Sequence, residues 1–181
     1  MKNTMMNRRA FIKTVSVITA AVASIPSISM ARLLTDSSKL TDEETLIFTK
    51  ILAVSLPTQD STLVDPNTLP VIPTLEGALL AGMEPHIRQG VRGGALYMSN
   101  EAAVKYGKPF HVLDDAQATQ FLDEWGDSDA VPQRALAMGL KKLVLLAYWA
   151  IPSTWEPIGY DGPVSDKWGI PKLGNTPEPQ S

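Results

Sequence analysis

The amino-acid sequence predicts an all-α protein, a small helical bundle followed by an extended C-terminal arm. Two observations indicate the bundle: apolar residues recur at helical spacing in several capped segments, and the period-two alternation typical of strands is scarce. A third observation indicates the arm, because six of the 14 prolines fall after residue 151, where no apolar period continues. We therefore expect a signal segment at residues 1–31, a bundle domain at 32–151 and an arm at 152–181.

The first 31 residues contain the three parts of a secretory signal in their usual order. A basic stretch at residues 7–13 precedes a weakly apolar stretch at 14–25, and small residues next to position 31 suit a cleavage site. The basic stretch resembles a twin-arginine signal, with Asn7 where Ser or Thr is usual. The alternative is an amphipathic N-terminal helix with two chance arginines. The residues expected to be recognised by the twin-arginine translocase are Arg8, Arg9, Phe11 and Lys13.

The chain contains few side chains that serve as nucleophiles, metal ligands or attachment points for a cofactor. It has no cysteine and two histidines, which excludes disulfides, cysteine nucleophiles, c-type haem attachment and multi-histidine metal sites. The four charged residues within 1–31 are all basic, so 12 of the 16 basic residues remain against 19 acids in 32–181, a net charge of about −7. Nucleic-acid binding requires a basic surface and is therefore not expected.

The first helix is expected to begin after Thr41, whose hydroxyl caps the first turn while Glu44, three residues later, completes a capping box. Apolar residues then recur at helical spacing until Pro57. Residues 57–73 contain four prolines and are expected to form a loop. A short helix is expected to follow at residues 74–83.

The next helix is expected to begin at Pro85, because proline suits the first helical position. Gly93 and Gly94 lie in its middle, where each costs roughly 1 kcal/mol relative to alanine. The pair indicates either close approach of another backbone or a break, after which a helix restarts near residue 99 and ends by Gly107. The apolar residues on one face of this helix are Ile87, Val91, Ala95 and Met98.

Two further helices are expected at residues 114–126 and 131–151. Asp114 caps the first and Gly126 ends it. In the second, residues 143–151 are apolar on every face and too short to span a bilayer. Such a segment must be buried on all sides, either as the central helix of the bundle or by another protein. The buried stripe of the first is expected to contain Ala118, Phe121, Leu122 and Trp125.

The arm combines prolines and glycines with large aromatic side chains. A solvated linker usually lacks such side chains, because exposed tryptophan promotes aggregation. Proline restricts the unfolded chain, and tryptophan and tyrosine dominate protein interfaces. We interpret the arm as a segment that lies in a groove, either of its own bundle or of a partner. The expected partner contacts are Tyr148, Trp149, Trp155, Tyr160 and Trp168.

Residues 148–163 resemble the C-terminal signature of the gluconate 2-dehydrogenase subunit 3 family, in which an aromatic pair closes the last helix and a Gly-Tyr-x-Gly-Pro turn follows. The aromatic pair here is Tyr148-Trp149, and the turn runs from Gly159 to Pro163. Residues 168–175 are similar to relatives found with flavin dehydrogenases of the glucose-methanol-choline type. The order of signal, bundle and tail resembles the plan of the family as well.

The resemblance implies a non-catalytic small subunit that escorts, stabilises and co-exports a catalytic subunit lacking its own export signal. FAD is then expected in that partner, and no cofactor or metal in this chain. The pair would cross the inner membrane through the twin-arginine translocase into the periplasm, often joined by a multihaem cytochrome c subunit. Attachment to the membrane, through the complex or through an uncleaved signal, is part of the same expectation.

No catalytic motif accompanies this resemblance. Gly-x-Gly-x-x-Gly after a strand and Gly-x-Ser-x-Gly are both absent from the sequence. Acidic residues at 42–44 and 114–115 lie at helix N-termini, where the helix dipole favours them. Asp123, Glu124, Asp127 and Asp129 lack the spacing of a calcium loop. We therefore expect no enzyme activity, and the alternative function is a free periplasmic binding or chaperone protein that uses the aromatic arm as a lid.

Overall fold

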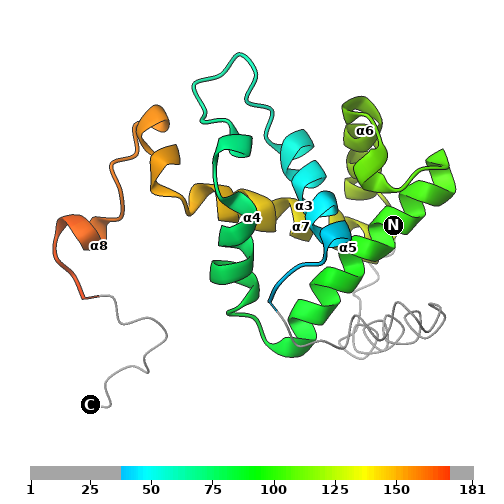
Figure 1. Cartoon of the computed structure of the whole chain (residues 1–181), viewed down its shortest axis with the longest axis horizontal. Helices are drawn as coiled ribbons and strands as arrows, with labels where there is room; N and C mark the ends of the chain where they lie inside the picture. The colour runs from blue at the N-terminus through cyan, green and yellow to red at the C-terminus, as the bar shows by residue number, and fades with distance from the viewer. Residues whose placement is uncertain (1–37, 172–181) are drawn as a thin grey trace, which may run out of the picture. The chain divides into compact units, whose positions relative to one another are not determined.

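The computed structural model describes residues 38–171, which contain helices and no strands (Figure 1). The prediction of an all-α fold is confirmed. The predicted signal at 1–31, with Arg8, Arg9, Phe11 and Lys13, lies outside the described residues, as does the end of the arm after residue 171. The helices of the bundle are α3 (Asp42–Ser55), α4 (Val71–Thr74), the π-helical segment η3 (Leu75–Leu80), α5 (Pro85–Tyr106), α6 (Asp115–Gly126) and α7 (Val131–Trp149).

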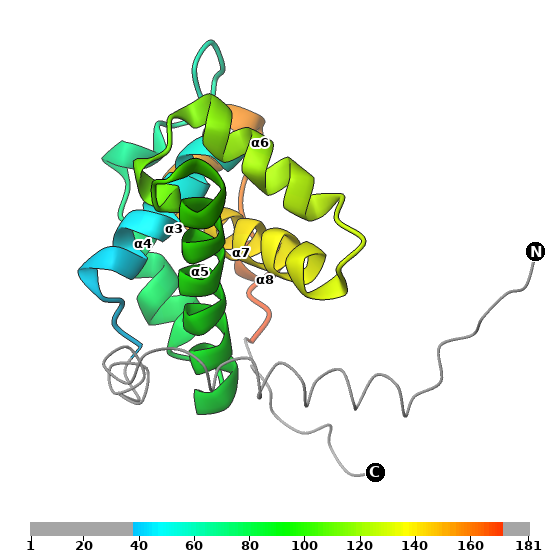
Figure 2. The same cartoon turned by 90° about the vertical axis from the view of Figure 1, so that its right-hand side faces the viewer.

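Helix α7 is the centre of the bundle, because α3, α4, η3, α5 and α6 all pack against it (Figures 1 and 2). Val144, Ala147 and Tyr148 are fully buried in its second half. Of the two explanations for the apolar segment at 143–151, the central core helix therefore accounts for this face. The opposite side of α7 is different, since Met138 and Leu146 remain exposed.

The start of α3 is the capping box that the sequence predicts. The Glu44 amide donates to Thr41 Oγ1 at 3.3 Å, and the Thr41 amide donates to Glu44 Oε2 at 2.7 Å. A cap of this kind contributes about 1 kcal/mol to helix stability. The helix then buries Ile47, Phe48 and Ile51 completely, so its capped end and its apolar face agree with one another.

The segment between α3 and α5 differs from its prediction. A 3₁₀ turn, η2 (Pro66–Thr68), interrupts the expected loop at 57–73. The following helix begins at Val71 and not at residue 74, and it ends at Leu80. Pro73 is tolerated there because the first turn of a helix has amides without intrahelical partners. The prediction, which was based on proline content, therefore placed the start of this helix about one turn too late.

Helix α5 is continuous through Gly93 and Gly94, so of the two alternatives for this pair the break does not occur. A Cβ atom placed on Gly94 would overlap the Cδ2 atom of Leu136 on α7, whereas one on Gly93 would meet nothing within 4 Å. Close approach therefore explains Gly94 but not Gly93, and the group that approaches Gly94 is the Leu136 side chain and not another backbone. The helix ends at Tyr106, and the next residue, Gly107, has a φ of 71°, the left-handed conformation that glycine adopts without strain.

Helices α6 and α7 lie close to their predicted bounds. Asp114 Oδ1 accepts the amide of Gln117 at 2.8 Å and caps α6. The predicted stripe of Ala118, Phe121, Leu122 and Trp125 is buried. Helix α7 ends at Trp149, two residues before the predicted Ile151, because the chain turns sharply into Pro152.

The described part of the arm, residues 152–171, contains no element longer than one turn. Its short helices are η5 (Pro152–Thr154), η6 (Glu156–Ile158) and α8 (Val164–Lys167), all beyond the end of α7 in Figure 1. Within 38–171, no single helix is long and apolar enough to cross a membrane; α7 and Pro152–Ile158 meet that test only as a pair, and the pair is bent by 92°.

Candidate partner-binding surfaces

A buried ion pair holds α5 against α3. Arg92 and Glu44 have side chains that are only 3% and 1% exposed. Arg92 Nε donates to Glu44 Oε1, and Arg92 Nη2 donates to Glu44 Oε2, both at 2.9 Å. The planar guanidinium suits this bidentate geometry, which fixes orientation as well as distance. Sequence reasoning assigned Glu44 to the cap alone and missed Arg92, because a partner 48 residues away leaves no local signal.

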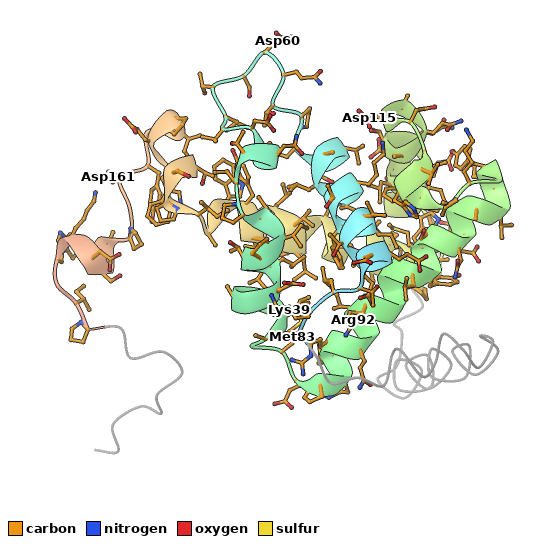
Figure 3. The ribbon with its side chains drawn as sticks, viewed as in Figure 1. Lys39, Asp60, Met83, Arg92, Asp115 and Asp161 are labelled. Carbon is orange, nitrogen blue, oxygen red and sulfur yellow. The ribbon has the colours of Figure 1, made fainter. Side chains whose placement is uncertain are left out.

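A second buried carboxylate lies beside this pair. Glu76 accepts hydrogen bonds from Lys39 Nζ at 2.7 Å and from the Leu40 amide at 2.8 Å. Burial raises the pKa of Glu76, but the hydrogen bonds from Lys39 and Leu40 outweigh that effect, so the pKa lies below its usual value. Figure 3 shows Lys39 on the segment that leads into α3 and Arg92 on α5. These charges tie the N-terminal end of the described chain to the bundle.

Tyr148, the first predicted partner contact, is fully buried. Its hydroxyl donates to the carbonyl of Val64 at 2.7 Å, and its ring meets Trp149 edge-on with centroids 4.9 Å apart. The side chain therefore ties the long 57–70 connection to α7 and leaves no surface for a partner. The aromatic pair at the end of α7 divides into a core residue, Tyr148, and a half-buried neighbour, Trp149.

Trp155 and Tyr160 are brought together at the start of the arm. Trp155 Nε1 donates to the Trp149 carbonyl at 2.8 Å, and the Trp155 and Tyr160 rings meet edge-on with centroids 5.3 Å apart. Gly162 completes the turn with a φ of 99°, a conformation that disfavours a side chain, and a Cβ there would also contact the Trp155 ring. Trp155 thus folds the turn back onto the end of α7, and Tyr160 stays 44% exposed.

Trp168 lies apart from the other aromatic residues, after α8. Its side chain is 75% exposed, and Val164 and Ile170 nearby are about half exposed. A largely exposed tryptophan beside two half-exposed aliphatic side chains gives little stability to the isolated chain, and such patches mark interaction sites. Of the predicted contacts, Trp168 therefore offers the most surface to a partner and Tyr148 the least.

One surface was missed by sequence reasoning. Ile87 was expected to share a single apolar face with Val91, Ala95 and Met98, and the last two are fully buried, but Ile87 is 48% exposed. It lies in a groove of about 530 Å³ between the first half of α5 and residues 135–146 of α7. The apolar period indicates which face points inward, and it does not indicate where the neighbouring helix diverges from it.

The acidic residues of α6 form ion pairs and line a shallow, open depression. No group of three histidine, aspartate or glutamate residues among the described residues is arranged to hold a metal ion. The pairs with lysines of other helices are Lys50–Asp115 at 2.6 Å, Lys141–Asp123 at 3.6 Å and Lys105–Glu124.

A family model described as gluconate 2-dehydrogenase subunit 3 matches residues 42–162. The match begins at the first residue of α3 and covers the bundle together with Trp149, Trp155 and Tyr160. Trp168 lies beyond it. Comparison with curated proteins and with solved structures gave no match.

Proposed function

The chain belongs to the gluconate 2-dehydrogenase subunit 3 family, and we propose that it is a non-catalytic small subunit that escorts, stabilises and co-exports a flavin-dependent catalytic subunit. The family description makes the chain a dehydrogenase subunit. The proposal adds that FAD is bound by the partner, that the complex is periplasmic, and that a multihaem cytochrome c subunit takes up the electrons.

The observation that carries the proposal is the exposed aromatic and aliphatic surface of the arm. Trp168 is 75% exposed, and Tyr160, Val164 and Ile170 are each about half exposed within the same short segment. Tryptophan and tyrosine contribute most of the binding energy where interfaces bury them. A bundle whose own core is already filled by Phe48, Phe110 and Phe121 has no need of these side chains for its stability.

The way the arm is held supports an interface function. Trp155 is bonded to the carbonyl of Trp149, so the first turn of the arm is fixed on α7 and the residues beyond it project from a defined point. Thr62 Oγ1, in the connection before α4, also donates to the Pro157 carbonyl at 3.5 Å. Pre-fixing one end of a binding segment reduces the entropy lost when the remainder orders on a partner.

Co-export is tested by expressing the chain with the flavin-dependent subunit of the same organism and measuring both proteins in the periplasm. Replacing Arg8 and Arg9 by lysine is expected to keep both subunits in the cytoplasm, because the partner would have no signal of its own. Normal export of the partner beside this variant would disprove the escort function. The measurement requires flavin absorbance and immunodetection of each subunit.

Assembly is tested separately by isolating the chain from the periplasm. The expected result is a stoichiometric larger protein with a flavin absorbance spectrum. A chain recovered alone and colourless would contradict the subunit function and favour a free binding protein that closes its arm over a ligand.

A further inference from the structure

Residues 38–40 form a short strap that leads into helix α3 (Figure 3). The strap has no helical turn of its own, and its Leu40 side chain is half-buried against the core. Two polar contacts join it to the bundle, and both end on one carboxylate: the Leu40 amide donates to Glu76 Oε1 at 2.8 Å, and Lys39 Nζ donates to Glu76 Oε2 at 2.7 Å. A single side chain of η3 therefore supplies both contacts.

Glu76 is brought to the strap by an unusual turn of its helix. The Ala81 amide donates to the carbonyl of Glu76 at 2.9 Å, a bond across five residues where a regular α-helix spans four. Leu75 and Leu80 are both fully buried, although five positions of a regular helix correspond to a rotation of about 140°. The wider turn brings the two leucines to one side, and Glu76, next to Leu75, is buried with them. Turns of this kind are frequent at functional sites.

The charges around Glu76 allow the strap to leave without stranding an ion in the interior. Burial raises the pKa of Glu76, but the hydrogen bonds of Lys39 and Leu40 and the charges of Lys39 and Arg92 hold it below its usual value. If the strap detaches, Arg92 still lies near Glu76 and remains bonded to Glu44. The Lys39 side chain is already 75% exposed, so its ammonium group needs little new hydration.

Helix α3 is anchored independently of the strap. Its first turn is closed by the capping box of Thr41 and Glu44, which uses no side chain or amide of residues 38–40. Three of its apolar side chains are then completely buried in the core, namely Ile47, Phe48 and Ile51. Detachment of the strap therefore removes none of the contacts that hold the helix in the bundle.

We propose that Glu76 is a latch, which holds the strap on the folded bundle and releases it while α3, α5 and α7 stay folded. Because η3 and its neighbours place the carboxylate, the latch closes only after the bundle has assembled. The chain that precedes residue 38 is then attached at a fixed point in a folded bundle and not in an unfolded one. This inference goes beyond the proposed function, since the latch belongs to the chain with or without a partner.

Hydrogen exchange of the full-length wild-type protein tests the latch without any substitution. The Leu40 amide is expected to exchange at least tenfold more slowly than in an unstructured peptide, and at least a hundredfold faster than the amide of the buried Ile51. Urea below the unfolding transition should leave the Leu40 rate almost unchanged, because local opening exposes little surface.

Two outcomes of that measurement would overturn the proposal. Exchange of Leu40 at the rate of an unstructured peptide would show that the strap is not held. Exchange at the rate of Ile51, with the same dependence on urea, would show that the strap opens only when the whole bundle unfolds.

Trypsin provides a second measurement, because it cuts after Lys39 only when the strap can extend into the protease. The rate at which products beginning at Leu40 form therefore reports the open state. Glu76→Met keeps a side chain of similar size and removes its acceptors, and it is expected to raise this rate at least tenfold. Glu76→Gln retains one acceptor for the Leu40 amide and should give a smaller rise.

Phe121→Leu is the control for a general loss of stability. Phe121 belongs to α6 and packs on Phe110 and Trp125, so the substitution loosens the core without removing a contact of Glu76. Cleavage after Lys39 should change less than twofold in this variant. Equal acceleration in Phe121→Leu and Glu76→Met would assign cleavage to global unfolding and overturn the proposal, as would a wild-type rate in Glu76→Met. If Glu76→Met does not fold, the exchange of the wild-type protein still decides the question.

Discussion

Two faces of α5 differ in which side chains they bury: one buries charged side chains, and the other leaves an apolar side chain exposed. On the face toward α3 and η3, Arg88 and Arg92 are buried, and Arg88 Nη1 donates to the carbonyls of Leu80 and Met83. On the face toward α7, the neighbouring Ile87 is almost half exposed. A guanidinium can be buried at little net cost in free energy when its donors are hydrogen-bonded. An isoleucine that remains exposed, by contrast, contributes little hydrophobic stabilisation.

The contrast separates two kinds of surface. On the face of α5 that carries Arg88 and Arg92, the buried side chains have their partners within the chain, so these residues determine whether the bundle folds. The groove and the arm leave apolar side chains exposed, so their residues are expected to determine binding and to contribute little to the stability of the fold. Five predictions test that division, from the largest expected effect to the smallest.

Arg92→Met is expected to destabilise the bundle by about 3–5 kcal/mol, because it leaves Glu44 as an unpaired charge in the interior. Unfolding by urea, followed by circular dichroism, measures the change. The double variant Glu44→Leu/Arg92→Met removes both charges and should recover most of the loss, apart from about 1 kcal/mol for the capping box. A single variant as stable as wild type would show that the ion pair does not hold α5.

Trp168→Ala is expected to raise the dissociation constant for the flavin-dependent subunit at least tenfold, as loss of a tryptophan anchor does. The free energy of unfolding should change by no more than about 0.5 kcal/mol, since the side chain is largely exposed. Titration and urea unfolding give the two values.

Trp155→Ala is the comparison for this residue, because Trp155 both donates to Trp149 and packs on Tyr160. We expect Trp155→Ala to weaken association with the flavin-dependent subunit and to lower the free energy of unfolding, with the larger effect on association. Equal losses of binding free energy and of unfolding free energy would show that Trp155 only stabilises the folded arm and does not contact the partner.

Gly94→Ala and Gly93→Ala are expected to change stability in opposite directions. Alanine at 93 should stabilise α5 by about 0.5–1 kcal/mol, because it meets nothing. Alanine at 94 must displace Leu136, and overpacking of this kind costs about 1–3 kcal/mol before the same helical gain is subtracted. Thermal unfolding of the two variants provides the comparison, and similar melting temperatures would show that Leu136 moves aside freely.

Glu76→Gln is expected to lower stability by about 1 kcal/mol at pH 7, through loss of the charged hydrogen bonds to Lys39 and Leu40. The folded-state pKa of Glu76 lies below its ordinary value of 4.5, so its contribution is present above pH 4.5 and is lost as the pH falls through the folded-state pKa. The difference between wild type and variant should therefore shrink in acid. A constant difference from pH 7 to pH 3 would contradict this explanation.

Features encoded within a few residues could be predicted from the sequence. The capping box at Thr41 and Glu44, the cap at Asp114, the stop at Gly107 and the buried stripe of α6 all depend on neighbours within one or two helical turns. The family resemblance was likewise carried by a short local signature, and the match over residues 42–162 confirms it.

Features that join distant residues were decided by the tertiary structure alone. Arg92 meets Glu44 across 48 residues, Tyr148 meets Val64 across 84, and Leu136 fills the space above Gly94. The groove depends on where α5 and α7 separate, which follows from the packing of both helices against the remainder of the bundle. A periodic pattern specifies the inward face of each helix, but the distance between two helices is set by all the side chains that lie between them.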